Sequence, residues 1–358
     1  MIIRTCSVQP LQAPLKTPFR IASGQHDSLD NLLFRITLDN KISGYGEAAI
    51  ATHITGETVP KTLAALKETA AALSGESIAD YFSLIAGIKE RLHDNHAALA
   101  AVEMAVLDAF TRTFRVPLWS LFANKPAYRF QTDITIVIGS IEEAYQAAVS
   151  WHRQGFRTFK IKIGKDKSLD TRRILAVHRA APKAGIIIDA NQAFTSTEIL
   201  KLLADLRRQK VCPILLEQPV ARADTDGLRR LTRLARIPVC ADESARSLDD
   251  VTRLLRSKTV NAINIKLMKS GLLESAQIAR VTHASGATLM IGAMMESSLA
   301  ITAAAHFAAG MGCFSFIDLD TTFFIRGPLS RSPYLDNHGH FNLSGCTPGT
   351  GVTVPTAP

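Results

Sequence analysis

The sequence predicts an α/β protein in which a barrel of parallel strands and helices follows a smaller α+β domain. From about residue 130 onward, short apolar or β-branched runs recur every 24 to 28 residues, each followed by a polar or glycine/proline break and an amphipathic stretch. Eight such units in roughly 200 residues fit a closed (β/α)8 barrel. A doubly wound open sheet is the alternative, but it normally carries a glycine-rich first turn, and the sequence has none.

The eight expected strands can be read along the chain. They lie in DITIVIG (133–139), TFKIKIG (158–164), GIIIDAN (185–191), PILLEQP (213–219), PVCADES (238–244), AINIKLM (262–268), TLMIGAM (288–294) and FSFIDLD (314–320). Helical segments separate them, for example 168–181, 196–209, 247–257 and 272–285. Because strands and helices alternate, the strands are expected to run parallel.

The residues before the barrel have a different pattern. Segment 31–48 (NLLFRITLDNKISGYGEA) predicts antiparallel strands joined by a turn at Asp39-Asn40. Helices are expected in 59–73, 79–92 and 95–114. After residue 326 the chain is rich in proline and glycine and is expected to pack back on the first domain. The expected division is an N-terminal α+β domain (1–125), a barrel with the active site (126–325) and a C-terminal segment (326–358).

The composition indicates a globular, cytoplasmic protein that binds neither nucleic acid nor a membrane. The net charge is +9, but arginines such as those in GLRRLTRLAR (227–236) fill the polar faces of amphipathic helices. Five scattered cysteines without a CxxC spacing argue against disulfides and zinc and fit a reducing compartment. The N-terminus lacks a signal-peptide pattern, and Glu296 and His306 interrupt the most apolar stretch.

Polar side chains gather at the ends of the expected strands, where a (β/α)8 barrel carries its chemistry. They are Lys160 and Lys162, Asp189 and Asn191, Glu217, Asp242 and Glu243, Lys266, Glu296, and Asp318 and Asp320. One charged strand end is ordinary. Charges at seven of the eight ends are hard to attribute to capping, because burying a charge without a partner costs several kcal/mol.

Three of these residues are hard oxygen donors on consecutive strands. Asp189, Glu217 and Asp242 suit Mg2+, which would keep positions open to water or substrate. No histidine or cysteine joins them, which disfavours zinc. In TFKIKIG the two lysines alternate with apolar residues, so both lie on one face of their strand.

The lysines of strands two and six are expected to flank this metal position from opposite sides of the barrel. Such opposed bases suit the removal of an α-proton from one face of a carboxylate substrate and its return on the other. Lys162 and Lys266 are therefore the expected bases. Lys160 is the expected auxiliary, whose positive charge lowers the pKa of Lys162 and helps to neutralise the charge that forms. Asn191 and Glu243 are expected to hold ligands or lysines in place.

These motifs resemble those of the enolase superfamily. KIK (160–162), DANQAF (189–194), LLEQP (215–219), ADES (241–244) and NIKLMKSG (264–271) occur in the order of its muconate-lactonising subgroup and cover the whole barrel. The resemblance implies a modified (β/α)7β barrel with an N-terminal capping domain, to which the C-terminal segment returns. It also implies two-lysine 1,1-proton transfer through an enolate that Mg2+ stabilises.

Within this subgroup, the sequence is most similar to the dipeptide epimerases. DLDTTFF (318–324) resembles their Asp-x-Asp pair, which implies that Asp318 and Asp320 hold the free α-ammonium group of the substrate. HITGET (53–58) is similar to their capping-domain loop, and 292–310 is similar to their seventh-strand region. The resemblance implies that Thr55, Met295 and Glu296, and the loop position occupied by Gly24, contact the substrate. The implied activity inverts the Cα of the second residue of a dipeptide.

Two positions depart from the family pattern. The usual Gly-Gly after the sixth strand is Gly271-Leu272 here. Gly24 stands at the loop position where alanyl-glutamate epimerases carry an arginine, so a glutamate side chain would lose its charge partner. Because Met294 and Met295 after the seventh strand are uncharged, neutral or hydrophobic second residues are expected, with cationic ones accepted if Asp27 reaches the pocket.

Other functions fit parts of the same pattern. An N-succinylamino-acid racemase/o-succinylbenzoate synthase or a muconate cycloisomerase would keep the lysines and metal ligands, but the acidic pair Asp318 and Asp320 would repel their anionic substrates. A barrel that binds a ligand without catalysis is the alternative from another class. The expected cofactor is Mg2+ and the expected partner is a small dipeptide; the sequence is also compatible with a homo-oligomer.

Overall fold

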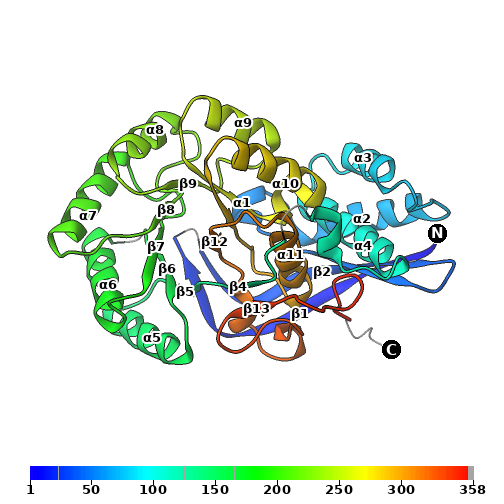
Figure 1. The fold of residues 1–358 in the computed structure, drawn as a ribbon, viewed down its shortest axis with the longest axis horizontal. Helices are drawn as coiled ribbons and strands as arrows, with labels where there is room; N and C mark the ends of the chain where they lie inside the picture. The colour runs from blue at the N-terminus through cyan, green and yellow to red at the C-terminus, as the bar shows by residue number, and fades with distance from the viewer. Residues whose placement is uncertain (23, 124–125, 165, 354–358) are drawn as a thin grey trace.

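A computed structural model describes residues 1–22, 24–123, 126–164 and 166–353, apart from the side chain of His53. Figure 1 shows a ring of strands and helices beside a second group of elements, α2 to α4 with the long strands β1 and β2. The expected domain boundary at residue 125 lies outside the described residues, so the division of the chain stays a prediction.

The barrel is an eight-stranded parallel sheet whose strands follow chain order. They are β5 (Ile134–Ile136), β6 (Thr158–Lys162), β7 (Gly185–Asp189), β8 (Leu215–Glu217), β9 (Val239–Ala241), β10 (Ala262–Ile265), β11 (Thr288–Ile291) and β12 (Phe316–Ile317). Each lies within one of the eight predicted segments. In the described part of the chain seven helices connect them, and short 3-10 turns, η2 (Thr321–Phe323) and η3 (Pro328–Ser330), follow β12. This arrangement confirms the (β/α)7β form.

Backbone contacts join the first and last strands of the sheet. The Asp133 N–H donates to Ile317 O (2.8 Å), and the Leu319 N–H donates to Thr132 Oγ1 (2.8 Å). These two bonds bring the start of β5 beside the residues that follow β12. The sheet therefore curls until its edges meet, and side chains from both ends of the barrel sequence share one interior.

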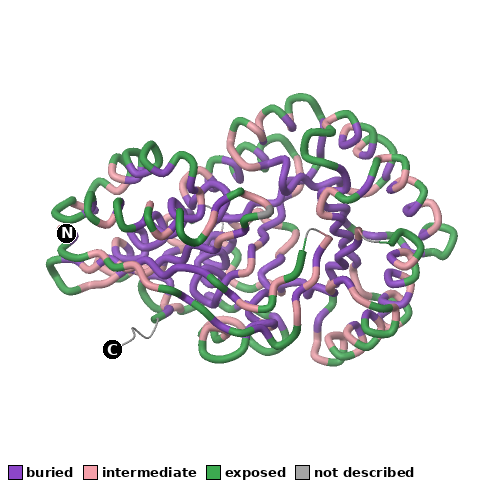
Figure 2. The backbone as a smooth tube through the Cα atoms, turned by 180° about the vertical axis from the view of Figure 1, so that it is seen from behind, coloured by how far each residue is buried: buried purple, intermediate pink, exposed green. Residues whose placement is uncertain are grey.

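The connecting helices include those expected at 168–181, 196–209, 247–257 and 272–285. They are α5 (Ile141–Gln154), α6 (Lys167–Ala180), α7 (Ser196–Arg208), α8 (Thr225–Leu234), α9 (Leu248–Arg256), α10 (Leu267–Ala284) and α11 (Ser298–Met311). Capping boxes at Ser140 and Thr195 begin α5 and α7. Leu228 and Leu231 of α8 are buried, and Figure 2 shows this pattern throughout, with buried strands inside and exposed outer faces on the helices.

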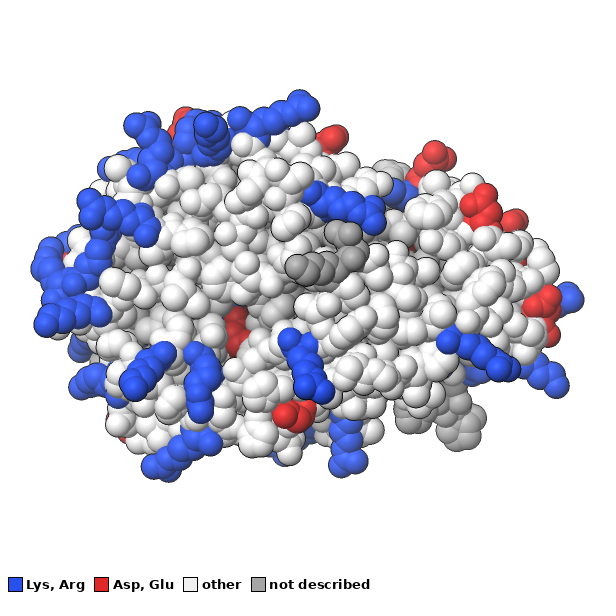
Figure 3. Space-filling view, viewed as in Figure 1, with Lys and Arg blue, Asp and Glu red and all other residues white. Residues whose placement is uncertain are grey.

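The basic residues are spread over the outside of the barrel. Figure 3 shows Lys and Arg side chains along the outer helices and the rim of the molecule, without one continuous basic face in this view. This distribution is typical of solvated helix faces. None of the helices in the described residues is both long and apolar enough to cross a membrane.

The N-terminal part combines an antiparallel sheet with helices. Its elements are β1 (Ile3–Ile21), β2 (Gly24–Leu38), β3 (Ser43–Ala48), the short α1 (Thr52–Thr55), α2 (Val59–Leu73), α3 (Tyr81–Arg91) and α4 (His96–Thr113). The turn between β2 and β3 falls at the predicted Asp39-Asn40. The sequence did not reveal β1, because Pro10, Pro14 and Pro18 disfavour a strand; β1 tolerates them as an edge strand with an irregular register after Pro14.

The C-terminal segment contacts both the barrel entry and the N-terminal helices. Strand β13 (His340–Asn342) pairs with β4 (Arg129–Gln131), which precedes the barrel. Farther along, the Thr350 N–H donates to Asp108 Oδ1 on α4 (2.7 Å), and Arg112 donates to Val352 O (2.8 Å). The segment therefore links α4 to the barrel.

Two buried glutamates of the N-terminal part hold the beginnings of barrel helices. Glu47 on β3 accepts hydrogen bonds from the backbone N–H groups of Ser297 (2.9 Å) and Ala300 (3.2 Å) at the start of α11. Glu103 on α4 accepts from the N–H groups of Leu272 (2.5 Å) and Leu273 (3.0 Å), where the helix of α10 begins again after its kink at Gly271. Because N–H groups at helix starts lack internal partners, these carboxylates join the two parts of the molecule.

Candidate active site

A pocket lies where the carboxyl ends of the barrel strands meet the N-terminal part, and it encloses about 620 Å3 out to its open mouth. The barrel contributes Thr135, Lys160, Lys162, Asn191, Lys266, Ala293, Met294, Met295, Asp318, Asp320 and Thr321 to its wall, and the N-terminal part contributes Phe19, Ile21, His26, Ile50, Ala51 and Ile54. The three predicted lysines and the acidic pair therefore share one pocket.

Lys160 and Lys162 leave the same face of β6, as their alternation predicts. Lys160 Nζ lies 3.0 Å from Asp189 Oδ2, 2.7 Å from Glu217 Oε2 and 2.7 Å from Asp318 Oδ2. Burial opposes its charge, but these carboxylates outweigh burial and raise the pKa of Lys160. Lys162 Nζ lies 2.6 Å from Asp189 Oδ2, its one ion pair among the described residues, and Lys162 is the more exposed of the two lysines.

Lys266 faces the same pocket from the far side. It directly follows β10, four strands away from β6 in a ring of eight, so it approaches from opposite Lys162. Lys266 Nζ lies 2.8 Å from Asp242 Oδ2. The neighbouring Lys269 donates to Asp242 Oδ1 (2.8 Å) and to the Asp242 and Asn264 carbonyls, and does not line the pocket.

The three predicted metal ligands end adjacent strands and are buried. Register pairs Asp189 with Glu217 on β7 and β8, and Asp242 follows β9. Lys160 lies between Asp189 and Glu217, and Lys266 pairs with Asp242. The three carboxylates are too far apart for one oxygen of each to lie within 4.8 Å of the other two. Lys266 and Lys269 overcome the effect of burial and hold the pKa of Asp242 well below its usual value, whereas burial and the nearby Asp189 raise that of Glu217 to about 7.

The donor set fits Mg2+ by its chemistry. Three carboxylates on consecutive strands offer only oxygen, and Glu217 Oε2, although close to Lys160, forms no hydrogen bond despite its burial. Asn264 Nδ2 holds the other oxygen of Glu217 at 2.8 Å. A divalent cation would satisfy the carboxylate that the protein leaves incompletely bonded.

The residues predicted to support the site have different positions. Asn191 lines the pocket; its backbone N–H donates to Asp189 Oδ1 (3.0 Å), and its amide donates to Glu243 Oε1 (3.4 Å). Glu296, predicted to contact the substrate, folds back on its own loop, where Oε1 accepts the Met294 N–H (2.8 Å). It is buried, does not line the pocket and forms no ion pair with a lysine of the described residues.

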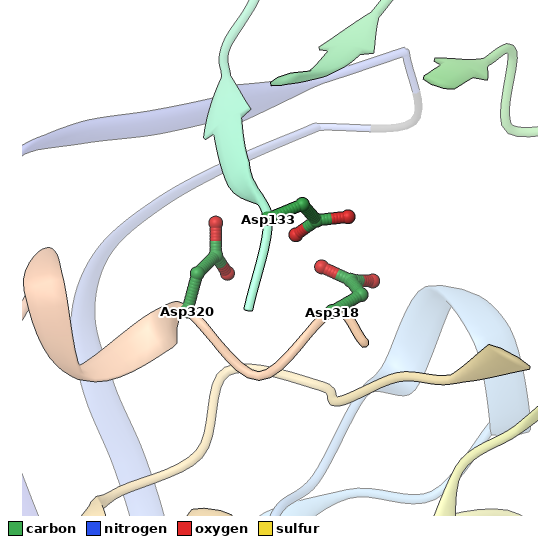
Figure 4. Close-up of side chains that lie close together, drawn as sticks. All are labelled: Asp133, Asp318 and Asp320. Carbon is green, nitrogen blue, oxygen red and sulfur yellow. The ribbon is translucent and has the colours of Figure 1, made fainter. Parts of the chain in front are cut away.

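Asp318 and Asp320 lie together at one end of the pocket, as predicted, and a third carboxylate joins them. Asp318 accepts from Lys160, and Asp320 Oδ2 accepts the Thr135 N–H (2.6 Å). Asp133, at the start of β5, is buried directly beside them (Figure 4). Burial, followed by repulsion from Asp318, raises the pKa of Asp320 to about 7.

Three residues of the N-terminal part that the sequence singled out lie away from the pocket wall. Gly24 begins β2 at an exposed position, with nothing within 4 Å of where a side chain would start, and it does not reach the pocket wall. Thr55 turns its hydroxyl to Ala51 O and Glu57, and its neighbour Ile54 lines the pocket instead. Asp27 is exposed and accepts from Gln25, away from the pocket.

Several pocket residues were not found from the sequence. They are Phe19, Ile21, His26, Ile50 and Thr135, with Asp133 behind the wall. Phe19 and Ile21 lie at the end of β1, a strand that its prolines made hard to predict, and His26 lies near the start of β2. Asp133 had a usable signal, because it occupies the start of a predicted strand where a buried carboxylate is unusual.

Comparison with known proteins agrees with this geometry. Residues 3–123 match the model of the "Mandelate racemase / muconate lactonizing enzyme, N-terminal domain", and residues 142–357 match that of the "Enolase C-terminal domain-like" family. The chain is 51% identical to the hydrophobic dipeptide epimerase of Citrifermentans bemidjiense over 349 residues, which is 96% of this chain and 95% of that protein.

Solved structures show the same likeness. The L-Ala-D/L-Glu epimerase of Bacillus subtilis, in a substrate-liganded complex, has a TM-score of 0.94 at 30% identity and 98% coverage of both chains. The dipeptide epimerase of Enterococcus faecalis, complexed with Mg and L-Leu-L-Tyr, has a TM-score of 0.90 at 32% identity, covering 98% of this chain and 99% of that one. This chain belongs to the mandelate racemase/muconate-lactonising family of the enolase superfamily.

Proposed function

We propose that the protein is a Mg2+-dependent dipeptide epimerase that inverts the Cα of the second residue of dipeptides with neutral or hydrophobic side chains. The observation that carries this proposal is the combination in one pocket of two opposed lysines, Lys162 and Lys266, with the acidic pair Asp318 and Asp320. The named activities of the relatives, several of which are dipeptide epimerases, support it.

The lysines perform the proton transfer. Lys162 and Lys266 approach from opposite sides of the barrel, so one removes the Cα proton from one face and the other delivers a proton to the opposite face. Each lysine must be neutral when it acts as a base, and its ion pair with Asp189 or Asp242 holds its Nζ toward the pocket. Lys160 is held between carboxylates and supplies positive charge where negative charge develops on the substrate.

Asp189, Glu217 and Asp242 would hold Mg2+. Bound Mg2+ supplies positive charge that polarises the substrate carboxylate and makes the Cα proton more acidic. Asn191 and Asn264 orient two of these carboxylates through the hydrogen bonds described above.

The two ends of the dipeptide meet different walls. Asp318 and Asp320 receive the α-ammonium group, which favours a free N-terminus. Phe19, Ile21 and Ile54 from the N-terminal part and Met294 and Met295 from the barrel give the rest of the pocket apolar surface. This apolar wall supports hydrophobic second residues, and the exposed position of Asp27 gives no support to cationic ones.

The rival functions differ at the acidic end of the pocket. An N-succinylamino-acid racemase/o-succinylbenzoate synthase or muconate cycloisomerase handles substrates that are anionic there, and Asp318 and Asp320 would repel them. A binding protein without catalysis would have no use for two opposed lysines. The scattered cysteines support a cytoplasmic location, and assembly into a homo-oligomer is a prediction that size-exclusion chromatography with light scattering tests.

The deciding experiment is epimerisation in D2O. Full-length protein with Mg2+ is incubated with a panel of L-Ala-L-Xaa dipeptides, N-succinylamino acids and muconate, and deuterium at Cα is followed by NMR. We expect exchange and inversion at the second residue, fastest for L-Ala-L-Phe or L-Ala-L-Leu. A panel led by L-Ala-L-Glu would contradict the specificity, and turnover confined to N-succinyl substrates or muconate would contradict the dipeptide assignment.

A further inference from the structure

Asp133 is a buried carboxylate at the acidic end of the pocket for which the structure shows no hydrogen-bond partner. Its side chain is 2% exposed, and neither Oδ1 nor Oδ2 accepts a hydrogen bond from the described residues. The backbone bond from Asp133 N–H to Ile317 O holds this residue in place beside the end of β12. Leaving a buried acceptor without a donor is costly, so the position calls for a donor from outside the protein.

The carboxylates of Asp133, Asp318 and Asp320 surround one small space. One oxygen from each lies within 4.8 Å of the others, and Figure 4 shows the three side chains turned toward a common region. Asp318 accepts from Lys160 and Asp320 accepts the Thr135 N–H, in both cases through Oδ2. The Oδ1 atoms therefore remain for a ligand, together with either oxygen of Asp133.

The spacing suits a primary ammonium group. Three N–H···O bonds of about 2.8 Å at tetrahedral angles place their acceptors about 4.6 Å apart. A singly charged group that enters from the pocket, past Asp318 and Asp320, fits the charge and the direction of approach.

We propose that Asp133 is the third carboxylate of the ammonium subsite and makes the site selective for substrates with three N–H donors on the first residue. This inference rests on the proposed function, because the ammonium belongs to a dipeptide. Asp318 and Asp320 alone would not require a third N–H donor on the substrate, and Asp133 adds this requirement. A primary ammonium can donate to all three carboxylates. An N-methyl ammonium keeps the charge but loses one N–H donor, and a des-amino substrate loses the charge and all of these donors.

The test compares these substrates on three full-length proteins with Mg2+: wild type, Asp133→Asn and Asp170→Asn. Asp170 is a control for the loss of a buried carboxylate, because it pairs with Arg173 and accepts the Gly164 N–H behind the end of β6, and it does not line the pocket. kcat and KM are measured for L-Ala-L-Phe, N-methyl-L-Ala-L-Phe and propionyl-L-Phe. The readout is the ratio of kcat/KM between substrates, which a loss of folded protein does not change.

In wild type we expect N-methylation to lower kcat/KM about tenfold or more. In Asp133→Asn the ratio of L-Ala-L-Phe to propionyl-L-Phe should fall about tenfold or more, mainly through KM, and the penalty for N-methylation should shrink. Asp170→Asn should keep the wild-type ratios. Unchanged ratios in a folded Asp133→Asn protein would overturn the inference.

If Asp133→Asn does not fold, the wild-type series decides. Equal kcat/KM for the primary and N-methyl substrates would overturn the third-carboxylate role, and a tenfold penalty would support it. Wild-type protein that epimerises no dipeptide would overturn the proposed function itself, and the role of Asp133 would fall with it.

Discussion

The two walls of the pocket differ in chemistry and in origin. The barrel wall carries buried charges at strand ends, including Lys160, Lys162 and Lys266, whereas the wall from the N-terminal part is apolar apart from His26. A reaction that moves a proton needs groups held within hydrogen-bond reach, and rigid strand ends provide this. Recognition of a hydrophobic side chain needs only complementary apolar surface. The barrel is therefore expected to control rate, and the N-terminal wall to control selectivity.

Metal removal should have the largest effect on the rate, because the three expected metal ligands belong to the barrel, which is expected to control the rate. Chelation with EDTA should abolish epimerisation, and added Mg2+ should restore it, since only oxygen donors are available at Asp189, Glu217 and Asp242. The measurement is the NMR exchange rate before and after dialysis. Full activity in a sample shown by elemental analysis to be metal-free would refute the assignment of these residues.

Replacing one base should be nearly as severe. Lys162→Ala should lower kcat for epimerisation about a thousandfold in both directions, because each direction uses both lysines. Exchange of one stereoisomer with D2O should persist through Lys266. Lys167→Ala, at an exposed lysine on α6, is the control and should behave as wild type. Wild-type rates in the Lys162 variant would mean that the base lies elsewhere.

A change at the junction where the N-terminal part packs on the barrel should alter the free energy of unfolding. Gly271 has φ +70° and ψ −175°, and an added Cβ would lie 2.6 Å from the Glu103 carboxylate that caps the adjoining helix. Gly271→Ala should lower the free energy of unfolding by about 2–4 kcal/mol, measured by chemical denaturation.

Gly286→Ala separates backbone strain from the clash with Glu103. Gly286 has φ +76° but open space around the added Cβ. This variant should cost about 1 kcal/mol. Equal losses in the two variants would show that the Glu103 contact contributes little to the junction.

Acid should lower the free energy of unfolding through His306, where α11 contacts Trp119 of the N-terminal part and Thr350 of the C-terminal segment. The ring is buried on α11, where Nδ1 accepts the Trp119 N–H and Nε2 donates to Thr350 O, and burial lowers its pKa to about 4. The unfolded chain, with a histidine pKa of about 6.5, then binds more protons than the folded chain between these values. Stability should therefore fall as pH drops from about 6.5 to 4, by up to about 3 kcal/mol.

The variant His306→Gln should remove this part of the pH dependence. Its amide can still donate to Thr350 O but does not titrate. The comparison is the difference in unfolding free energy between wild type and variant at each pH. A difference that stays constant between pH 7 and pH 4 would contradict the role of His306.

The N-terminal wall should produce the smallest and most selective change. Ile54→Ala removes apolar surface from the pocket and should lower kcat/KM for L-Ala-L-Phe relative to L-Ala-L-Ala about tenfold, with kcat nearly unchanged. Leu63→Ala, on α2 and outside the pocket, is the control. A fall in kcat for both substrates would mean that this wall also positions the reacting groups.

Much of the barrel could be predicted because its signals are local. Each strand is a short apolar run that ends in a polar residue, and alternation within TFKIKIG alone places Lys160 and Lys162 on one face. The contacts of the charged side chains could not be predicted in the same way. The position of Lys269 against Asp242 and Asn264 depends on how α10 begins, and the sequence identified it only as the next polar residue after a strand.

The sequence by itself determined the order of elements, a barrel of eight strands with helices between them and the charged groups at the strand ends, because these depend on periods of two and 3.6 residues. Tertiary structure decided which residues complete the pocket. Asp133 meets Asp318 only because the sheet closes over 185 residues of chain, and Phe19 reaches the pocket through a strand that its prolines conceal. Such contacts depend on closure and packing between distant segments, which no local pattern encodes.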